Sequence, residues 1–430
     1  MTTNNSFSYL HGLGNHHESE ALPGALPGRQ HSPQQVPYHL YAEQINGNSF
    51  TTPRFSNLKA WQYRLRPSVL HSGNQPNKMR SDLLQGKFTQ TPPAQMRWAP
   101  ISYKTGHYNI FEGSVKYLYN GTVGQDGCAI YLYTATASMK DQFFINHDAE
   151  MLFIPQEGEL IFKTEFGRLN IKPGDIAVLP RGVCFQVELL NDKARGYWVE
   201  NYGQVFTLLS RGVIGANGTT EELDFRIPVA WYEERSGDFT MLRKFNGHVW
   251  EHAISHSPLD VVAWCGTYYP YQYDLSLFKP MFTASIDHPD PSIFVVLSSP
   301  SLAPGTSNLD FIIFPERWMV ADHTFRPPYY HRNAMSEFMG NIRGAYDAKE
   351  HGFLPGGASL HNCMLGHGPD TEAYDHAIKQ VLKPQYYEGN LAFMLESNKL
   401  FEITAEAYES PLREMQYQDC WKDLKLNFKK

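Results

Sequence analysis

Three short apolar segments lie close together in the chain: Ala129–Thr134 (AIYLYT), Met151–Ile154 (MLFI) and Glu159–Lys163 (ELIFK). They are rich in β-branched and aromatic residues, and Gly, Asp, Asn and Pro residues separate them. Short segments of this composition, at a spacing of about 8 to 12 residues, are typical of β sandwiches and barrels. This stretch therefore predicts a mainly β fold.

A similar texture returns later in the chain. Ser292–Leu297 (SIFVVL) and Asp310–Phe314 (DFIIF) are strand-like and precede the Pro327-Pro328 pair. We therefore expect a division near residue 280, with a larger N-terminal β-sandwich domain over residues 1–280 and a smaller C-terminal domain over residues 281–430. The chain has 430 residues, a length that agrees with two or three folded units.

Helical periodicity is scarce along the chain. The best helix candidates are Thr371–Val381 and Leu412–Leu426. The first 60 residues are rich in Gly, Pro, Asn and His, and we expect irregular backbone with few strands there. The Asn15-His16-His17-Glu18 string within this part is interpreted as surface or subunit-contact structure, because adjacent histidines on a Gly-flanked segment rarely converge on one ion.

Charge and composition exclude several classes of function. The net charge of -7 leaves no basic stripe for nucleic acid or for an anionic membrane surface. There is no run of 18 apolar residues and no signal-like segment at the start. The five cysteines are scattered, with no CxxC pair, which favours free thiols in a reducing compartment. We expect a cytoplasmic protein.

The C-terminal part contains a candidate metal site. His331–Gly344 resembles the first cupin motif, HxH…E…G, with Glu337 in the acidic position and Asn333 where the second histidine would stand. Alternate residues of a strand face the same side, so one strand or a hairpin could aim His331 and Glu337 into a barrel mouth. Gly352–His361, followed by His367, is a loose form of the second motif, PxGxxH.

Two imidazoles and one carboxylate suit non-haem Fe(II), which needs open positions for O2 and substrate. Zinc is the competitor, since Cys363 lies near the cluster; however, no second cysteine is close in sequence. The sequence does not separate iron from manganese. The alternative is that these histidines bind no metal and are ordinary hydrogen-bonded polar residues.

The N-terminal part carries a degenerate copy of the same motifs. Gly174–Phe185 follows the second cupin motif, with Phe185 in the place of the histidine. Asp148–Gly158 has the character of the first motif without its histidines. We therefore expect a cupin-type barrel that has lost its metal ligands and serves as scaffold and subunit contact.

The segment Arg326–Gly340 (RPPYYHRNAMSEFMG) resembles the homogentisate 1,2-dioxygenase family. Further strings similar to this family occur along the chain: Gly12–Asn15, Pro37–Gln44, Ile214–Gly218, Asp287–Ile293 and Gly352–Gly357. The resemblance implies a cupin-like β sandwich or jelly roll, with the site in the smaller C-terminal domain.

The resemblance also implies roles for single residues. It assigns His331, Glu337 and His367 as iron ligands, His288 as the proton acceptor, and Tyr346, together with His367, as substrate-binding. His361 then becomes a residue near the metal or the substrate, although motif spacing alone favours His361 over His367 as the ligand.

Three other residues are candidates for the surroundings of the site. Asn333 could orient a ligand, face the substrate or be an ordinary polar strand residue. Arg326 and Lys349 are, beside Tyr346, candidates to meet a substrate carboxylate.

The implied reaction is Fe(II)-dependent, extradiol-type cleavage of the homogentisate ring with both atoms of O2. Its product would be maleylacetoacetate, in tyrosine and phenylalanine catabolism. The family also implies a homo-hexamer built from two trimers. Two alternatives stay open: a cupin dioxygenase for another hydroxylated aromatic acid such as gentisate, and a cupin binding or storage protein without such activity.

Overall fold

A computed structural model describes residues 7–71, 73–210, 220–280, 285–286, 291–346, 348–349 and 351–430. Most of its regular elements are strands, so the expected mainly β fold is confirmed. The largest sheet has nine strands in the order β1 (Tyr9–His11), β16 (Arg226–Pro228), β20 (Tyr271–Asp274), β13 (Asp175–Leu179), β10 (Glu150–Glu157), β15 (Ala194–Asn201), β8 (Asp126–Ala135), β7 (Ser114–Thr122) and β28 (Glu402–Ile403).

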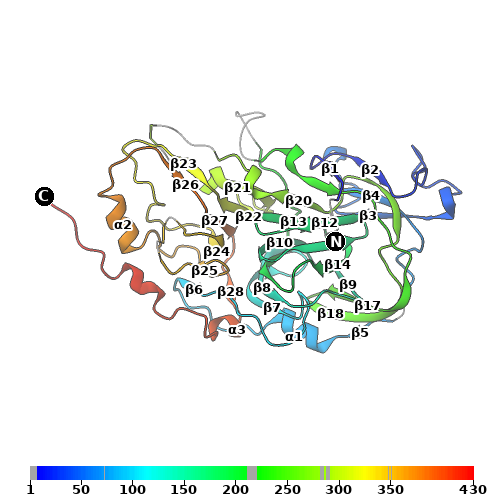
Figure 1. The fold of residues 1–430 in the computed structure, drawn as a ribbon, viewed down its shortest axis with the longest axis horizontal. Coiled ribbons are helices and arrows are strands. Elements are labelled where there is room, and N and C mark those ends of the chain that lie inside the picture. Colours follow the sequence, from blue (N-terminus) through cyan, green and yellow to red (C-terminus); the bar gives the residue numbers. More distant parts are fainter. Residues whose placement is uncertain are drawn as a thin grey trace.

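The other sheets lie around this one (Figure 1). A seven-stranded sheet has the order β12 (Gly167–Ile171), β11 (Leu160–Thr164), β14 (Cys184–Leu189), β9 (Gln142–Asn146), β17 (Ser236–Phe245), β18 (His248–His256) and β5 (Gln75–Pro76). A four-stranded sheet has β2 (His17–Glu20), β19 (Val261–Gly266), β4 (Lys59–Arg64) and β3 (Tyr41–Asn46).

The C-terminal part forms its own sheet. Its six strands are β21 (Val295–Pro300), β22 (Ser307–Phe314), β27 (Leu391–Ser397), β24 (Ser336–Arg343), β25 (Ala358–His361) and β6 (Met96–Trp98). A two-stranded sheet, β23 (Arg317–Met319) with β26 (Gln385–Tyr387), completes it.

The nine-stranded sheet is the middle layer of the molecule. One of its faces packs against the seven-stranded sheet over an aromatic core, in which Phe153 contacts Phe162 and Phe185. Phe185, which stands in the place of a motif histidine, is fully surrounded by this core. The interior of the N-terminal sandwich is therefore filled by rings, which pack in stacked, tilted and edge-to-face pairs.

The other face of the middle layer meets the C-terminal sheet. Tyr197 of β15 packs against Phe393 of β27, and its hydroxyl donates a hydrogen bond to the carbonyl of Gly357 at 2.6 Å. Two short strands also cross between the parts: β6 joins the six-stranded sheet, and β28 joins the nine-stranded one. The division near residue 280 stays a prediction.

Sequence expectations for single elements are partly confirmed. The described part of the first 60 residues is mostly irregular, with the short strands β1, β2 and β3 and the start of β4, as expected. A helix is present at the first candidate, where α2 (Thr371–Ala377) is capped by Asp370, whose side chain accepts a hydrogen bond from the Ala373 amide; it ends before Val381. Residues 292–294 belong to a 3-10 helix rather than to a strand, and β21 starts at Val295. The sequence missed α1 (Lys78–Gln85), which Asn77 caps.

The predicted helix over Leu412–Leu426 is wrong. Only a short 3-10 turn, Tyr417–Trp421, forms there, after a four-residue helix α3 (Ala405–Tyr408). Met415 and Leu426 of the apparent apolar stripe are exposed. A helix of this length depends on burying such a stripe, so the segment follows its tertiary contacts instead.

None of the helices in the described part of the chain is long and apolar enough to cross a membrane.

Candidate metal centre

The floor of the site is one row of polar side chains across the C-terminal sheet. Asp310 on β22 pairs with Glu396 on β27, Glu396 pairs with Glu337 on β24, and Glu337 pairs with His361 on β25. Residues in register on neighbouring strands share one face of a sheet. All four line a cavity of about 520 Å³.

His331 and His367 reach this row from outside the strands. They form an isolated antiparallel bridge, in which each backbone amide donates to the other's carbonyl, at 3.0 and 3.1 Å. The expectation that His331 shares a strand or hairpin with Glu337 is therefore wrong in its geometry. The long-range bridge to His367 brings His331 to the carboxylate.

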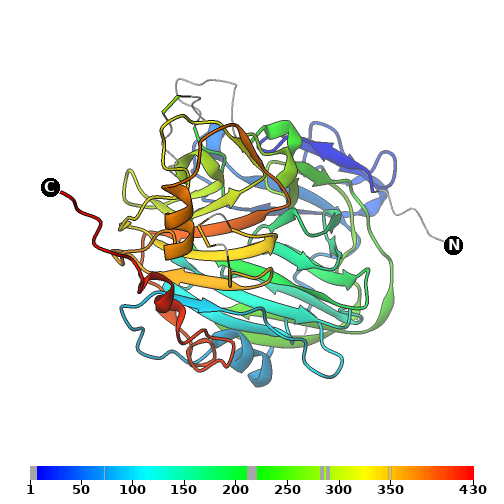
Figure 2. The same ribbon diagram turned by 60° about the vertical axis from the view of Figure 1, so that its left-hand side comes forward.

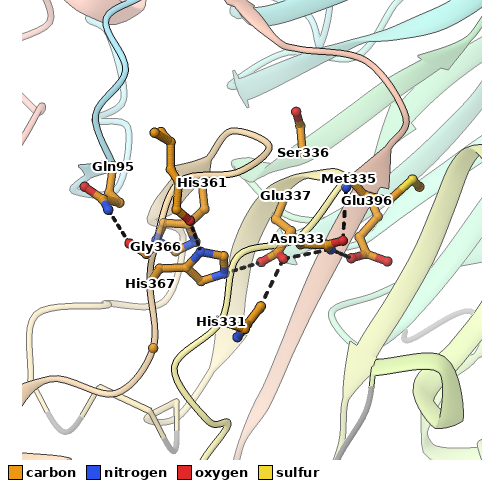
Figure 3. Close-up of polar contacts among 12 residues, drawn as sticks. Gln95, His331, Asn333, Met335, Ser336, Glu337, His361, Gly366, His367 and Glu396 are labelled. Carbon is orange, nitrogen blue, oxygen red and sulfur yellow. Dashed lines mark hydrogen bonds and ion pairs between the residues drawn. The ribbon is translucent and has the colours of Figure 1, made fainter.

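Three side chains converge as a candidate metal ligand set (Figure 3). One ligand atom from each of His331, Glu337 and His367 lies within 4.8 Å of the others. Nε2 of His367 is 2.9 Å from one oxygen of Glu337, and Nε2 of His331 is 3.5 Å from the other. Within the described part of the chain, this is the group of histidine, cysteine and acidic residues that could hold a metal ion.

Each histidine is oriented through its second ring nitrogen. Nδ1 of His331 lies 2.8 Å from the carbonyl oxygen of Tyr329, and Nδ1 of His367 lies 2.9 Å from that of Leu365. A carbonyl accepts only, so Nδ1 carries the proton and donates, and the lone pair is placed on Nε2. This is the arrangement that metal-binding histidines usually show.

Electrostatics keep the carboxylate of Glu337 charged. Burial alone would raise the pKa of Glu337, but the contacts of its two oxygens with the rings of His331 and His367 outweigh it and hold that pKa well below its usual range. The same contact with Glu337 raises the pKa of His331. The buried site thus keeps an anionic carboxylate, whose charge a bound metal cation would balance.

Asn333 links two acids of the floor. Its amide nitrogen donates to Glu337 at 3.1 Å and to Glu396 at 2.6 Å, and its oxygen accepts from the Met335 amide at 3.0 Å. The residue in the place of a motif histidine therefore binds the candidate ligand Glu337 (Figure 3). Glu396 was not singled out in the sequence, because a lone acid on a strand gives no motif signal.

His361 lies beside the ligand set without joining it. Its ring stacks on that of His367, with centroids 4.4 Å apart, and its Nε2 is 3.1 Å from the Tyr417 hydroxyl. Burial lowers the pKa of His361 well below its usual value, so the ring is neutral. Tyr417, from the segment expected to be helical, is a second residue that the sequence did not reveal.

The remaining candidates are placed differently. Tyr346 and Lys349 line the cavity, and the Lys349 ammonium donates to the Gly368 carbonyl at 3.0 Å. Arg326 is buried and donates to the carbonyls of Lys383 and Ala321, and it does not line the cavity. His288 lies outside the described residues, as do Asp287 and the Ile214–Gly218 string.

The histidines at the start of the chain lie in another part of the fold. His17 contacts the Gly12 carbonyl at 2.7 Å, and His16 pairs with Glu18 at 3.5 Å.

Comparison with known proteins identifies the family. Residues 8–275 match the family model described as homogentisate 1,2-dioxygenase N-terminal, and residues 276–428 match the model for its C-terminal part. This chain belongs to the homogentisate 1,2-dioxygenase family.

Relatives in this family share about half of their residues with the chain. A homogentisate 1,2-dioxygenase from Rhodopseudomonas palustris strain BisB18 is 51% identical over 424 residues, covering 98% of this chain and 94% of that protein. One from Nitrobacter hamburgensis is 50% identical over 432 residues with the same coverage. The family resemblance expected from the sequence is confirmed.

Among solved structures, a mutant of Bacillus subtilis oxalate decarboxylase aligns at 12% identity, with 79% of this chain and 87% of that chain covered and a TM-score of 0.32. A cupin 2 conserved barrel domain protein from Leptotrichia buccalis aligns at 8% identity, covering 70% and 92%, with a TM-score of 0.29. Likeness at this level carries no argument about function.

Proposed function

We propose that this member of the homogentisate 1,2-dioxygenase family is an iron(II)-dependent enzyme that opens the aromatic ring of homogentisate with O2 to give maleylacetoacetate. The observation that carries the proposal is the convergence of His331, Glu337 and His367 in a cavity, in a chain about 50% identical to proteins named for this reaction. The proposal places the activity in tyrosine and phenylalanine catabolism.

The donor set fits iron(II). Two neutral imidazoles and a carboxylate on one side of a cavity leave the opposite positions for other ligands, as in non-haem iron oxygenases. A closed structural zinc site would call for further thiolate or imidazole ligands. When bound, iron(II) supplies the redox chemistry with O2, and it favours the phenolate form of the substrate.

The chain's own residues supply orientation and charge. Glu337 stays ionised at every pH near neutrality because its pKa is depressed. The Tyr329 and Leu365 carbonyls fix the two imidazole rings. We propose His367 rather than His361 as the second histidine ligand, because Nε2 of His361 faces Tyr417 instead of Glu337.

The cavity has chemistry suited to a small hydroxylated acid. Tyr346 and Lys349 line it, and we propose them as hydrogen-bond donors to the substrate. Asp310 and Glu396 on the floor would repel a carboxylate and can accept from a phenolic hydroxyl. The substrate carboxylate would therefore lie toward Lys349, away from the acidic row. Arg326 is not part of this proposal, since backbone carbonyls bind it.

His288 is proposed, from the family alone, to take the phenolic proton. Unperturbed histidine has a pKa near neutrality, which suits a general base at this step. A hexamer of two trimers and a cytoplasmic location are likewise proposals from the family.

The runner-up substrate is gentisate, another dihydroxylated aromatic acid. The two assignments differ in a substrate panel: iron-loaded protein should consume O2 rapidly with homogentisate and slowly or not at all with gentisate. Parallel loading with manganese and zinc tests the metal. Rapid O2 uptake with gentisate but not with homogentisate would make gentisate the substrate. Absence of O2 uptake with both acids would favour a cupin binding or storage protein.

A further inference from the structure

A second polar cavity, of about 460 Å³, lies in the N-terminal part and shares no lining residue with the metal-centre cavity. Its lining comes from β9, β14, β17 and β18 of the seven-stranded sheet and from β3 and β4 of the four-stranded sheet. Alternation along the strands explains its lining. Phe144 and Leu242 point into the aromatic core, so Ile145, Met241 and Arg243 point the other way.

Two arginines line the cavity, of which Arg64 is buried and Arg243 is half-buried. Arg64 is saturated: its guanidinium lies 3.3 Å from Glu43, 3.2 Å from Glu165 and 3.1 Å from Asp260. Arg243, by contrast, makes no ion pair within the described ranges, and its Nε is buried without a hydrogen-bond partner. Arg243 therefore presents a guanidinium to the cavity that no acid of the described chain neutralises, and its buried Nε can donate to an acceptor there.

Two further nitrogen atoms on the cavity wall have no partner. Nε2 of Gln62 and Nδ1 of His252 are buried and make no hydrogen bond, in side chains that are 1% and 4% exposed. Burial and then the charge of Arg243 lower the pKa of His252 to about 4, so this ring is neutral and its Nδ1 can carry a hydrogen. Buried polar groups in native proteins almost always have a partner, so three such nitrogens around one cavity point to a bound acceptor.

The other side chains that line the cavity restrict which kind of hydrogen-bond acceptor can bind there. Ile145, Met241 and Ile254 present an apolar surface. Glu43 and Glu165 also line the cavity, and they disfavour a multiply charged ion. One unpaired cation, several donors and an apolar wall together suit a monoanion with a hydrocarbon body.

We propose that this cavity binds a small organic carboxylate, with its carboxylate on Arg243, Gln62 and His252 and its apolar body against Ile145, Met241 and Ile254. The site is separate from the metal centre and independent of the reaction proposed there.

The test is a crystal soak with 4-bromobenzoate, whose bromine is located by anomalous scattering. We expect a bromine peak in this cavity, with the carboxylate within hydrogen-bond distance of Arg243, whether or not a second peak lies in the metal-centre cavity. A parallel soak with selenate, a divalent anion, should leave this cavity empty of selenium.

Substitutions at Arg243, compared with a control variant, separate loss of binding from loss of folding. Arg243→Gln should abolish the peak and weaken solution binding at this site at least tenfold, as expected for the loss of a charged hydrogen bond. Arg243→Lys should retain the peak. Arg168→Gln is the matched control, because Arg168 lies on the same sheet, stacked on Phe7 and Trp231, outside the cavity.

Three results would overturn the proposal: no bromine in this cavity, a segment of a neighbouring subunit filling it, or selenate binding there as well as 4-bromobenzoate. Retention of the peak in Arg243→Gln would overturn the role of the arginine.

Discussion

Asn333 occupies a position where two negative charges approach each other. Its amide nitrogen lies between the carboxylates of Glu337 and Glu396, which face each other on neighbouring strands. Without this donor the two acids would repel, and Glu337 would lose the contact that occupies one of its oxygens. The amide thus orients the carboxylate toward the histidines.

Asn333→Ala should therefore weaken iron binding about 10- to 100-fold, the usual cost of losing a partner of a metal ligand. Anaerobic Fe(II) titration of the apo-protein measures this directly. Asn398→Ala is the control, because Asn398 follows the same strand as Glu396 and binds Ser301 instead. Unchanged iron affinity in Asn333→Ala would mean that the amide does not position Glu337.

Tyr417→Phe removes the hydroxyl that contacts His361 and keeps the ring that stacks near Arg97. We expect a loss of about 1 kcal/mol of stability, because a buried imidazole nitrogen loses its partner. Iron content should stay at the wild-type level. Thermal unfolding and metal analysis of the same sample check both, and loss of iron in this variant would place His361 among the ligands.

The motif around His331 and Glu337 could be recognised from the sequence because its residues lie within a few positions of one another. The choice between His361 and His367 was not, since both follow the same Gly-rich turn. The bridge between His331 and His367, 36 positions apart in sequence, settles their proximity, and no local pattern encodes such a bridge. Glu396 and Tyr417 were invisible for the same reason.

Strand β24 carries Glu337 and is packed on its other side through a glycine. A methyl group at Gly340 would lie 2.3 Å from the ring of Phe393 and 3.0 Å from that of Tyr197. Because this is the contact between the C-terminal sheet and the middle layer, neither ring has free space beside it.

Gly340→Ala should destabilise the protein by about 1–3 kcal/mol through overpacking. A drop in melting temperature of a few degrees, with a lower iron affinity, is the expected result. Gly73→Ala is the control, since a methyl group there meets nothing within 4 Å. Equal melting temperatures of the two variants would contradict tight packing at β24.

Strands were easier to foresee than helices. The segments around Ile130, Leu152 and Ile161 are strands because dense β-branched and aromatic residues are buried on both faces of central sheets. The stripe in Leu412–Leu426 looked equally regular, but its side chains bind separate places: Arg413 lies over Tyr408 and Glu414 pairs with Arg97. Periodicity alone cannot show whether a face has something to pack on.

A carboxyl group buried in the middle sheet makes the stability of the molecule depend on pH. Glu150 lies in the middle sheet, where one of its oxygens accepts from the Phe206 amide at 2.8 Å and from Asn201 at 3.2 Å. Burial raises the pKa of Glu150 to about 7, against a usual 4.5, although these hydrogen bonds lower it in part.

The folded protein therefore keeps a proton on Glu150 that the unfolded chain releases above about pH 4.5. The contribution of Glu150 to the free energy of unfolding is fully present below about pH 4.5 and is lost as the pH rises to about 7. Above that pH it changes no further, and the total loss is roughly 3 kcal/mol. Glu150→Gln can keep both hydrogen bonds and should remove this part of the decline. Melting temperatures from pH 5 to 8 measure it.

Glu234→Gln, at an exposed position, is the matched control and should leave the pH profile as in the wild type. If Glu150→Gln and wild type lose stability in parallel between pH 5 and 8, the raised pKa of Glu150 is not the cause.

The overall class of fold followed from composition and strand spacing, but the way its parts interlock did not. Strand β6 comes from residues 96–98 and lies in the C-terminal sheet, and β28 comes from residues 402–403 and lies in the middle one. Pairings between residues more than 250 positions apart depend on the assembled molecule.

The central claim is that iron held by His331, Glu337 and His367 opens homogentisate. Its most direct test is oxygen uptake after anaerobic Fe(II) loading, with bound iron measured in the same samples, for wild type, His367→Ala and His361→Ala. We expect wild type to consume equal amounts of O2 and homogentisate, His367→Ala to lose both iron and uptake, and His361→Ala to retain iron. Absence of uptake by iron-loaded wild type, or full uptake by His367→Ala, would contradict the account.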